Sequence, residues 1–536
     1  MKFQNISASF ALAAVTALAA CSSGSSTPAG NTVPPPVPAP ASRIVGVGDS
    51  LTAGYQSAGW LGAAPGSIAN PLCTAAPAPG CAAVGLGVPP GQESGYWAQI
   101  WMQANGGTAA QYGQLVTPYS SVLPLISGPG LGNQIVNANP ALTGGVPFGT
   151  LPTRSGCDSF NQAAYSLNLA NTTVRANPGG TVLDLGIPGI TLHEAIAMNQ
   201  PLSPTCVPIS SNPLISGLQS LLSESAGYYP VLGGFPSKTT MLQAAVLDKP
   251  TIATVWLGAN DVLHYAFSGG TFTAVDGIGG NTAQVQQDVT TIVTTLQKAG
   301  ANVVVANLPD VLKSPFFMSV APVSPASCTA PPVALTANLT CVLATNPALA
   351  PSAATITAQV ASAYGLGTTG YVTLGGAITI LQAIGAGQTP NLDPNGAGSG
   401  LGQNYVTPAL ATQIQALNDT LNSGINAAAT ATKVPLVDVH TIFNDLATGC
   451  ASGCANDPFA GQALTLNPGK CCTLAFGGGL VSFDGLHPSN TGYALIAEAF
   501  IAAIDSGYSL TIPNVNLLNQ YSGTGTIPFP DPYAQH

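Results

Sequence analysis

Charged side chains are scarce in this sequence. Of 536 residues, 10 are Lys or Arg and 20 are Asp or Glu, so 6% of the chain is charged, where soluble domains usually carry about 25%. Nucleic-acid binding depends on many basic contacts to phosphates, so these few cations and a net charge of −10 argue against a nucleic-acid partner. Small uncharged residues, among them 62 Gly and 46 Pro, replace the charges. The composition therefore does not exclude neutral or apolar substrates.

One stretch lacks charge altogether. From residue 314 to 392 there is no Asp, Glu, Lys or Arg. Its most apolar part, YVTLGGAITILQAIGAG at 371–387, is interrupted by Gly, Thr and Gln, which argues against a transmembrane helix. We expect a lid or a wall around an apolar substrate, with Ile380 at its centre. Surface elaboration without a function is the alternative.

The sequence also lacks two glycines that would define known loops. In VGVGDSLTAGY, residues 45–55, Leu51 stands where a dinucleotide-binding loop needs its third glycine. Thr52 stands where the G-x-S-x-G nucleophile elbow needs its last one. What remains is Ser50 at the end of an apolar strand, with Asp49 expected to position the loop. Ser50 is a nucleophile only if other segments supply a base and donors for an oxyanion.

The first residues have the pattern of an export signal. Residues 1–20 hold a short apolar core that ends in small residues, as in signal peptides. Residues 18–21, LAAC, resemble the lipobox of bacterial lipoproteins, in which the cysteine is diacylated; an ordinary signal peptide cut near Ala20 is the alternative. We expect Cys21 to anchor the protein to a membrane of the bacterial cell envelope. Residues 21–42 read as a Pro- and Ser-rich tether.

The chain contains eleven cysteines, which supports export from the cytoplasm. Without Cys21 their number is even, which in an oxidising compartment favours disulfides. Cys73–Cys81 and Cys328–Cys341 are close enough in sequence to form bridges, although the connectivity stays open. A zinc site would use Cys450, Cys454, Cys471 and Cys472, but C-x3-C followed by CC differs from ordinary zinc knuckles. The sequence therefore predicts disulfides and no metal.

Five short β-branched runs predict buried parallel strands; they lie at 43–48, 181–186, 251–258, 302–309 and 434–440. Helical patterns accompany them at 96–107, 281–300, 408–430 and 489–507. This alternation predicts a three-layer α/β/α domain with a parallel sheet. Two stretches, about 56–180 and 314–409, are longer than a normal crossover and predict large insertions. We place the domain at 43–510 and a C-terminal tail at 511–536.

A serine needs a base to remove its proton. His487 lies in FDGLHPSN, just before the last helix, and Asp484 is three residues earlier on the same loop. That spacing lets the carboxylate bind one imidazole nitrogen, fix the tautomer and stabilise the imidazolium. We expect Ser50, His487 and Asp484 to form a catalytic triad.

Donors for an oxyanion are also present at strand ends, where open α/β sheets place their ligands. WLGANDVL supplies Asn260 after the third strand, and LDLGIPGITL supplies the amide of Gly189 after the second. Ser50 adds its own amide. An acyl-transfer transition state needs such converging donors.

The motifs together resemble the GDSL esterase/lipase, or SGNH hydrolase, family, in which Ser, Gly, Asn and His come from four blocks in this order. GDSLTAGY resembles the first block, LDLGIPGIT the second, Gly258–Asp261 the third, and DGLHPS at 484–489 the block with the histidine. Asp184 departs from the Asn that many members carry, which leaves Gly186 as the alternative oxyanion glycine. The resemblance implies a flavodoxin-like fold and hydrolysis of carboxylic esters without metal or organic cofactor. It does not extend over the two insertions.

The hypothesis from sequence is an exported, lipid-anchored serine esterase or lipase acting on a small-molecule or lipid ester. The uncharged insertion favours acyl or aryl esters. A polysaccharide O-deacetylase of the same fold is the alternative among enzymes. A non-catalytic surface-binding lipoprotein is the alternative outside them.

Overall fold

The computed structural model of the chain describes residues 43–55, 60–61, 95–105, 130–131, 182–199, 231–232, 234–236, 238–271, 282–329, 336–344, 346–392, 404–448, 474, 480–482 and 485–515. Several predictions lie outside these ranges: the signal peptide, the tether with Cys21, Asp484, the pair Cys73–Cys81, the four cysteines weighed for zinc, and the tail beyond residue 515.

A parallel sheet forms the centre of the domain. Its strands run in the order β1-β4-β5-β9, with β1 at Ile44–Gly48, β4 at Ile252–Trp256, β5 at Asn302–Ala306 and β9 at Leu436–Val437. Every residue of β1 and β4 is buried, as expected for strands covered on both faces. The two strands pair from Ile44 opposite Ile252 to Gly48 opposite Trp256.

The second predicted strand lies on the other side of β1. Gly46 donates to the Leu183 carbonyl and accepts from the Leu185 amide, and Ile187 donates to the Gly48 carbonyl. Among the residues described from 182 onward, only Asp184 forms a full parallel bridge with β1, at Gly46. Numbered along the chain, the spatial order is 2-1-3-4-5, which is the flavodoxin-like order. The predicted fold is confirmed.

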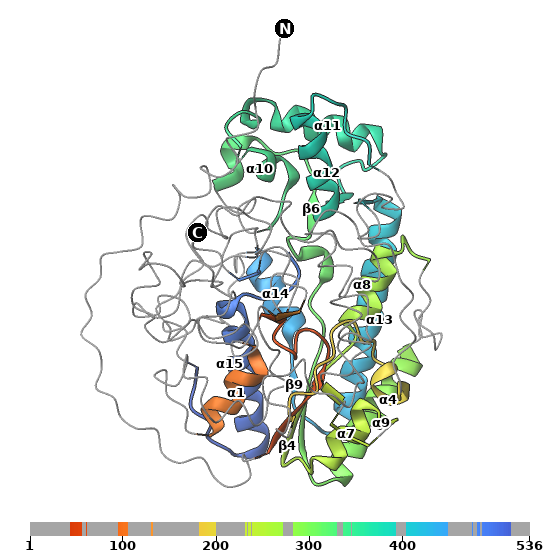
Figure 1. Ribbon diagram of the computed structural model, residues 1–536, viewed down its shortest axis with the longest axis vertical. Helices are drawn as coiled ribbons and strands as arrows, with labels where there is room; N and C mark the ends of the chain where they lie inside the picture. The colour runs from red at the N-terminus through yellow and green to blue at the C-terminus, as the bar shows by residue number, and fades with distance from the viewer. Residues whose placement is uncertain are drawn as a thin grey trace, which may run out of the picture.

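Helices cover both faces of the sheet (Figure 1). On one face lie α1 (Tyr96–Ala104) and α15 (Asn490–Tyr508), and on the other α7 (Met241–Leu247), α8 (Ala259–Phe267), α9 (Thr282–Lys298) and α13 (Pro408–Thr432). Two further helices are α4 (Glu194–Ala197) and α14 (Val439–Thr448). The four helices expected from periodicity are present within a few residues of their predicted ends. None of the helices in the described ranges is both long enough and apolar enough to span a membrane.

Sequence signals account for several helix ends. Val285, Val289, Ile292 and Leu296 form the buried face of α9. Ser489 caps α15, since its hydroxyl accepts from the amide of Gly492. Thr407 caps α13 in the same way, and the next residue, a proline, takes the first helical position, which its fixed φ suits.

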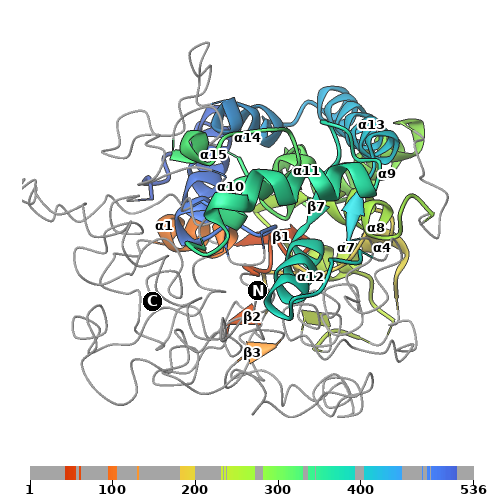
Figure 2. The ribbon, with the colours of Figure 1, turned by 90° about the horizontal axis from the view of Figure 1, so that it is seen from above.

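The insertion at 314–409 builds a separate layer beyond the end of β5. It contains an antiparallel sheet of β6 (Phe317–Ser319), β7 (Tyr371–Thr373) and β8 (Tyr405–Val406). Its helices are α10 (Leu339–Ala344), α11 (Ala353–Ala363) and α12 (Leu374–Gly385), with short 3₁₀ turns η8 (Pro325–Thr329) and η10 (Ala350–Ser352). Figures 1 and 2 place α10, α11 and α12 together at one end of the domain.

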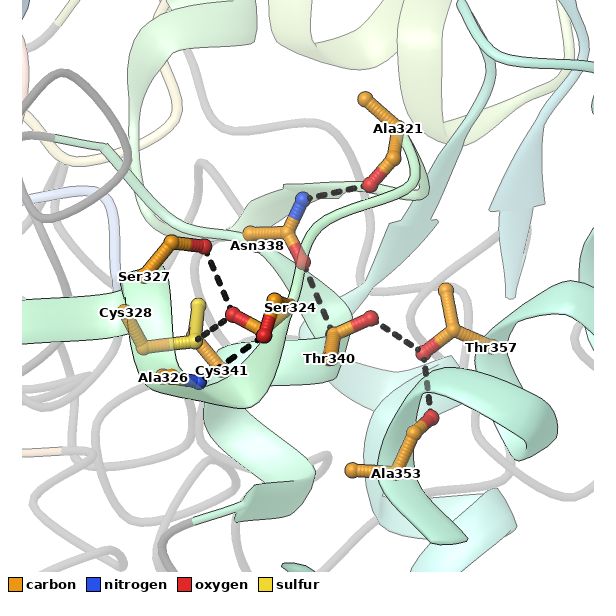
Figure 3. Close-up of a disulfide and its surroundings, with 10 residues drawn as sticks. All are labelled: Ala321, Ser324, Ala326, Ser327, Cys328, Asn338, Thr340, Cys341, Ala353 and Thr357. Carbon is orange, nitrogen blue, oxygen red and sulfur yellow. Dashed lines mark hydrogen bonds between the residues drawn. A yellow bond between two sulfur atoms is a disulfide. The ribbon is translucent and has the colours of Figure 1, made fainter.

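A disulfide between Cys328 and Cys341 fastens η8 to α10 (Figure 3). This is one of the two pairs that the spacing suggested. Beside it, the amide of Asn338 donates to the Ala321 carbonyl and its oxygen accepts from the Thr340 amide. The disulfide and the Asn338 bonds hold the start of α10 to the loop before it.

Ile380 lies inside this layer. Ile380 has 0% exposure, whereas Ile378, Leu381 and Ile384 of the same helix are only partly buried. The helix does not provide an open apolar surface at Ile380, where the sequence suggested one.

The other insertion, 56–180, is described only in part. It contributes α1 and a two-stranded antiparallel pair, β2 (Trp60–Leu61) with β3 (Gly130–Leu131).

Candidate active site

Ser50 occupies a tight turn directly after β1. Asp49 accepts a hydrogen bond from the Leu51 amide at 2.9 Å, and its carbonyl accepts from the Ala53 amide at 3.0 Å. Thr52 reaches back over the strand, where a Cβ on Gly48 would lie 1.8 Å from its hydroxyl oxygen. Gly48 is therefore needed for close approach between the strand and the turn.

An aromatic cluster supports the turn from beneath. The Thr52 hydroxyl lies 2.9 Å from the Tyr96 hydroxyl. The Tyr96 ring stacks on Phe500 of α15 at 4.7 Å between centroids and meets Trp256 of β4 edge to face. The turn thus rests on side chains from one helical layer, α1 and α15, and from the sheet itself.

His487 lies against Ser50. Its Nε2 is 2.8 Å from the Ser50 hydroxyl oxygen, although the two residues are 437 positions apart in the chain. Both side chains are buried, at 3% and 5% exposure. The ring of Tyr55 lies 5.0 Å from the imidazole, centroid to centroid. This is the contact that a serine and its base require.

The loop before His487 is held by backbone bonds. The Ser482 amide donates to the His487 carbonyl at 2.8 Å, and the Phe316 amide donates to the Gly485 carbonyl at 2.9 Å. Gly485 has a φ of 73°, and a Cβ there would lie 2.8 Å from the Phe316 nitrogen. The base of the insertion and the histidine loop are therefore packed together. Asp484, the predicted orienter, lies outside the described residues.

Asn260 stands in the first turn of α8. The turn begins at Gly258, whose φ of 115° is open to glycine and strained for other residues. The side-chain amide of Asn260 donates to the Ile190 carbonyl at 3.0 Å. The Asp261 carboxyl accepts from the backbone amide of Leu192 at 3.0 Å. Since a side-chain amide carries two N–H donors, a second N–H of Asn260 is available for a ligand.

The two candidate oxyanion glycines differ in their surroundings. The Gly186 amide donates to the Asp184 carboxyl at 3.0 Å, and a Cβ at Gly186 would lie 2.4 Å from the Ala53 nitrogen. Gly186 is thus engaged in local bonding and packing. Gly189 has a φ of 85° and lies one residue before Ile190, whose carbonyl Asn260 binds. This favours Gly189 over Gly186 as the donor.

Buried carboxyl groups lie beneath the turn. Burial raises the pKa of Asp49 to about 7, against the opposing effects of the Leu51 amide and His487. Burial also raises the pKa of Asp184 well above its usual value. Both groups therefore favour the protonated form over a wider pH range than exposed carboxyls do.

A pocket opens at the serine–histidine pair. It contains about 540 Å³ of empty space, counted with the solvent at its mouth. Ser50, Asn260 and His487 share its lining, which brings three of the predicted site residues to one cavity. The other lining residues are Leu51, Trp256, Ala259, Leu263, Pro309, Asp310, Val311, Ser314, Leu486, Pro488 and Phe443. Most of them are apolar.

Sequence reasoning missed Asp310 and Phe443. Asp310 follows the fourth strand in NLPDVL, at the sheet edge where Asn260 follows the third, and this placement could have indicated it. Nothing in the local sequence distinguishes Phe443 of α14. Of the uncharged stretch 314–392, only Ser314 belongs to the pocket lining. Within the described ranges, no three His, Cys, Asp or Glu residues gather as metal ligands do.

The sheet order explains why these segments meet. In a 2-1-3-4-5 sheet the strand order reverses between the first and third strands, and ligands bind at the carboxyl ends there. Ser50 follows β1 and Asn260 follows β4, the two strands that flank this point. Fold and site together define the class of protein, a hydrolase built on a flavodoxin-like three-layer domain.

The chain belongs to the GDSL-like lipase/acylhydrolase family, whose model matches residues 44–500. A search of curated proteins found no match. The resemblance inferred from the four sequence blocks is confirmed, and membership makes the protein an ester hydrolase in the general sense.

Proposed function

We propose that the protein is a carboxylic-ester hydrolase that uses Ser50 as its nucleophile and His487 as its base. The observation that carries the proposal is the 2.8 Å contact between His487 Nε2 and the Ser50 hydroxyl, two buried groups in the lining of a largely apolar pocket. A non-catalytic binding protein would not need a histidine in contact with a serine hydroxyl and an asparagine in the same pocket lining.

In the first half of the reaction, the Ser50 oxygen attacks the ester carbonyl carbon while His487 Nε2 accepts the hydroxyl proton. The bond to the alcohol oxygen then breaks, and His487 returns the proton to the leaving alcohol. In the second half, His487 activates water, which releases the acid and restores Ser50. Asp484 is proposed to orient His487 and to stabilise its charged form.

The negative oxygen of the tetrahedral intermediate needs fixed donors. We assign this role to the amides of Ser50 and Gly189 and to the side chain of Asn260. The bond from Asn260 to the Ile190 carbonyl supports the assignment, because it ties the side chain to the loop that carries Gly189. Preorganised donors of this kind cost no reorganisation during the reaction.

For the substrate we propose an ester with an apolar acyl or aryl group, since apolar residues dominate the pocket lining. The protein is proposed to act outside the cytoplasm, anchored to a bacterial membrane through lipid on Cys21. The lipobox-like LAAC supports the anchor. The disulfide Cys328–Cys341 supports an oxidising compartment.

The test is hydrolysis of 4-nitrophenyl butyrate by the purified protein and its Ser50→Ala and His487→Ala variants. Each should lower kcat by about 10³-fold or more, because triad members act as a unit. Ser506→Ala, at an exposed serine of α15, is the matched control and should keep wild-type activity. Labelling by a fluorophosphonate probe should likewise require Ser50. Ser50→Ala that retains more than a tenth of the activity would refute the assignment.

A further inference from the structure

The pocket has one acidic wall residue. Among its described lining residues, Asp310 is the only one with a charged side chain besides the titratable His487, and none is Lys or Arg. Its neighbours Pro309, Val311, Leu263 and Phe443 are apolar. Asp310 is therefore the one acidic residue in a lining made mostly of apolar residues.

Local bonds fix the carboxyl group of Asp310. It caps the 3₁₀ turn η7 (Val311–Lys313), and its Oδ1 accepts from the Leu312 amide at 3.1 Å. The residue is 7% exposed. Burial raises its pKa from the usual value, whereas the Lys313 ammonium and the Leu312 amide oppose that shift. A group held in this way keeps its position when a ligand arrives.

The nearest cation balances this charge only in part. The Lys313 Nζ lies 3.7 Å from Asp310 Oδ2, but its side chain is 33% exposed. The ammonium also donates to Asn444, and Lys313 does not belong to the pocket lining. Solvent screens an ion pair at such a position. A second carboxylate, Asp419, raises the pKa of Asp310, but its effect is smaller than the opposing effects of Lys313 and His440.

We propose that Asp310 selects substrates by charge, so that the pocket accepts neutral or cationic acyl groups and rejects anionic ones. This inference rests on the proposed esterase function. The acyl group stays bound to Ser50 after the alcohol has left, and Ser50 and Asp310 line the same pocket. Like charges brought together away from water repel strongly, and such repulsion is an effective means of excluding a competing substrate.

The test compares three 4-nitrophenyl esters that differ in the distal group of a six-carbon acyl chain. They are the neutral hexanoate, the anionic mono-ester of adipate and the cationic 6-(trimethylammonio)hexanoate. For each protein, kcat/KM of the two charged esters is divided by that of hexanoate at pH 8. These ratios cancel any general loss of activity.

In Asp310→Asn the ratio for adipate should rise about tenfold and the ratio for the cationic ester should fall about tenfold, equivalent to roughly 1.4 kcal/mol each way. Asparagine keeps an oxygen that can accept from the Leu312 amide, so η7 keeps its cap. Shifts of opposite sign cannot come from a change of shape alone. Lys313→Gln should move both ratios the other way and gives an independent measurement.

Asp419→Asn is the matched control, because it removes a nearby exposed carboxylate that does not line the pocket. Its ratios should stay within about twofold of wild type. If Asp310→Asn and Lys313→Gln both keep the wild-type ratios, the inference is overturned, while the proposed esterase function still stands. A protein that hydrolyses none of the three esters would overturn the esterase proposal and this inference with it.

Discussion

Gly186→Ala should impair catalysis although Gly186 is not among the residues that line the pocket. A Cβ at this position would lie 2.4 Å from the Ala53 nitrogen and 2.8 Å from the Asp49 carbonyl oxygen. Both atoms belong to the backbone of the turn that carries Ser50, so no flexible side chain can yield. Ordinary contact begins at 3.4 Å, and the turn must therefore retreat by about 1 Å, a displacement that can cost about 10²-fold in rate.

The assay pairs kinetics with stability. We expect kcat/KM for 4-nitrophenyl butyrate to fall about 10²-fold, because the 2.8 Å contact between Ser50 and His487 is disturbed. Crowding within a packed region should also lower the free energy of unfolding by about 1–3 kcal/mol. Circular dichroism and a denaturant titration on the same samples separate the loss of rate from unfolding.

Gly385→Ala is the matched control, since it makes the same change at the last residue of α12, where a Cβ meets nothing within 4 Å. Alanine favours a helix over glycine by about 1 kcal/mol, so this variant should be as active as wild type and no less stable. The reasoning fails if Gly186→Ala keeps more than half of wild-type kcat/KM with an unchanged unfolding midpoint.

Three further predictions concern the oxyanion donor, the anchor and pH. Asn260→Ala should lower kcat by about 10²–10³-fold, the scale of one lost oxyanion donor; a loss below threefold in steady-state kinetics would contradict this role. Cys21→Ser should move the protein from the membrane fraction to the soluble fraction on cell fractionation, and an unchanged distribution would show that LAAC is not the anchor. Burial raises the pKa of Asp49 to about 7, so the folded protein favours the protonated form of this carboxyl. The stabilisation that this form contributes is fully present below about pH 4 and is lost as pH rises through about 7. The thermal midpoint should therefore fall between pH 5 and pH 8, and Asp49→Asn, which stays uncharged, should flatten that fall.

Local patterns in the sequence were enough to predict the framework. β-branched runs predicted strands that are buried on both faces. Periodic apolar residues predicted a helix over 281–300, and α9 spans Thr282–Lys298. Because parallel strands end at one edge of a sheet, residues after successive strands could be expected to meet there. Ser50, Asn260 and His487 do line one pocket. This much follows from residue type, spacing and chain order.

The walls of the pocket depended on tertiary structure. Phe443 reaches the pocket because α14 packs against η7, which in turn packs against α8, and no local pattern specifies that packing. Ile380 was expected to face an apolar substrate, but it is fully buried. An apolar run indicates burial and does not specify what the side chain is buried against. Gly186 is required because a distant turn approaches its backbone. Such contacts join segments far apart in sequence, so only the folded chain, in which Ser50 and His487 meet across 437 positions, determines them.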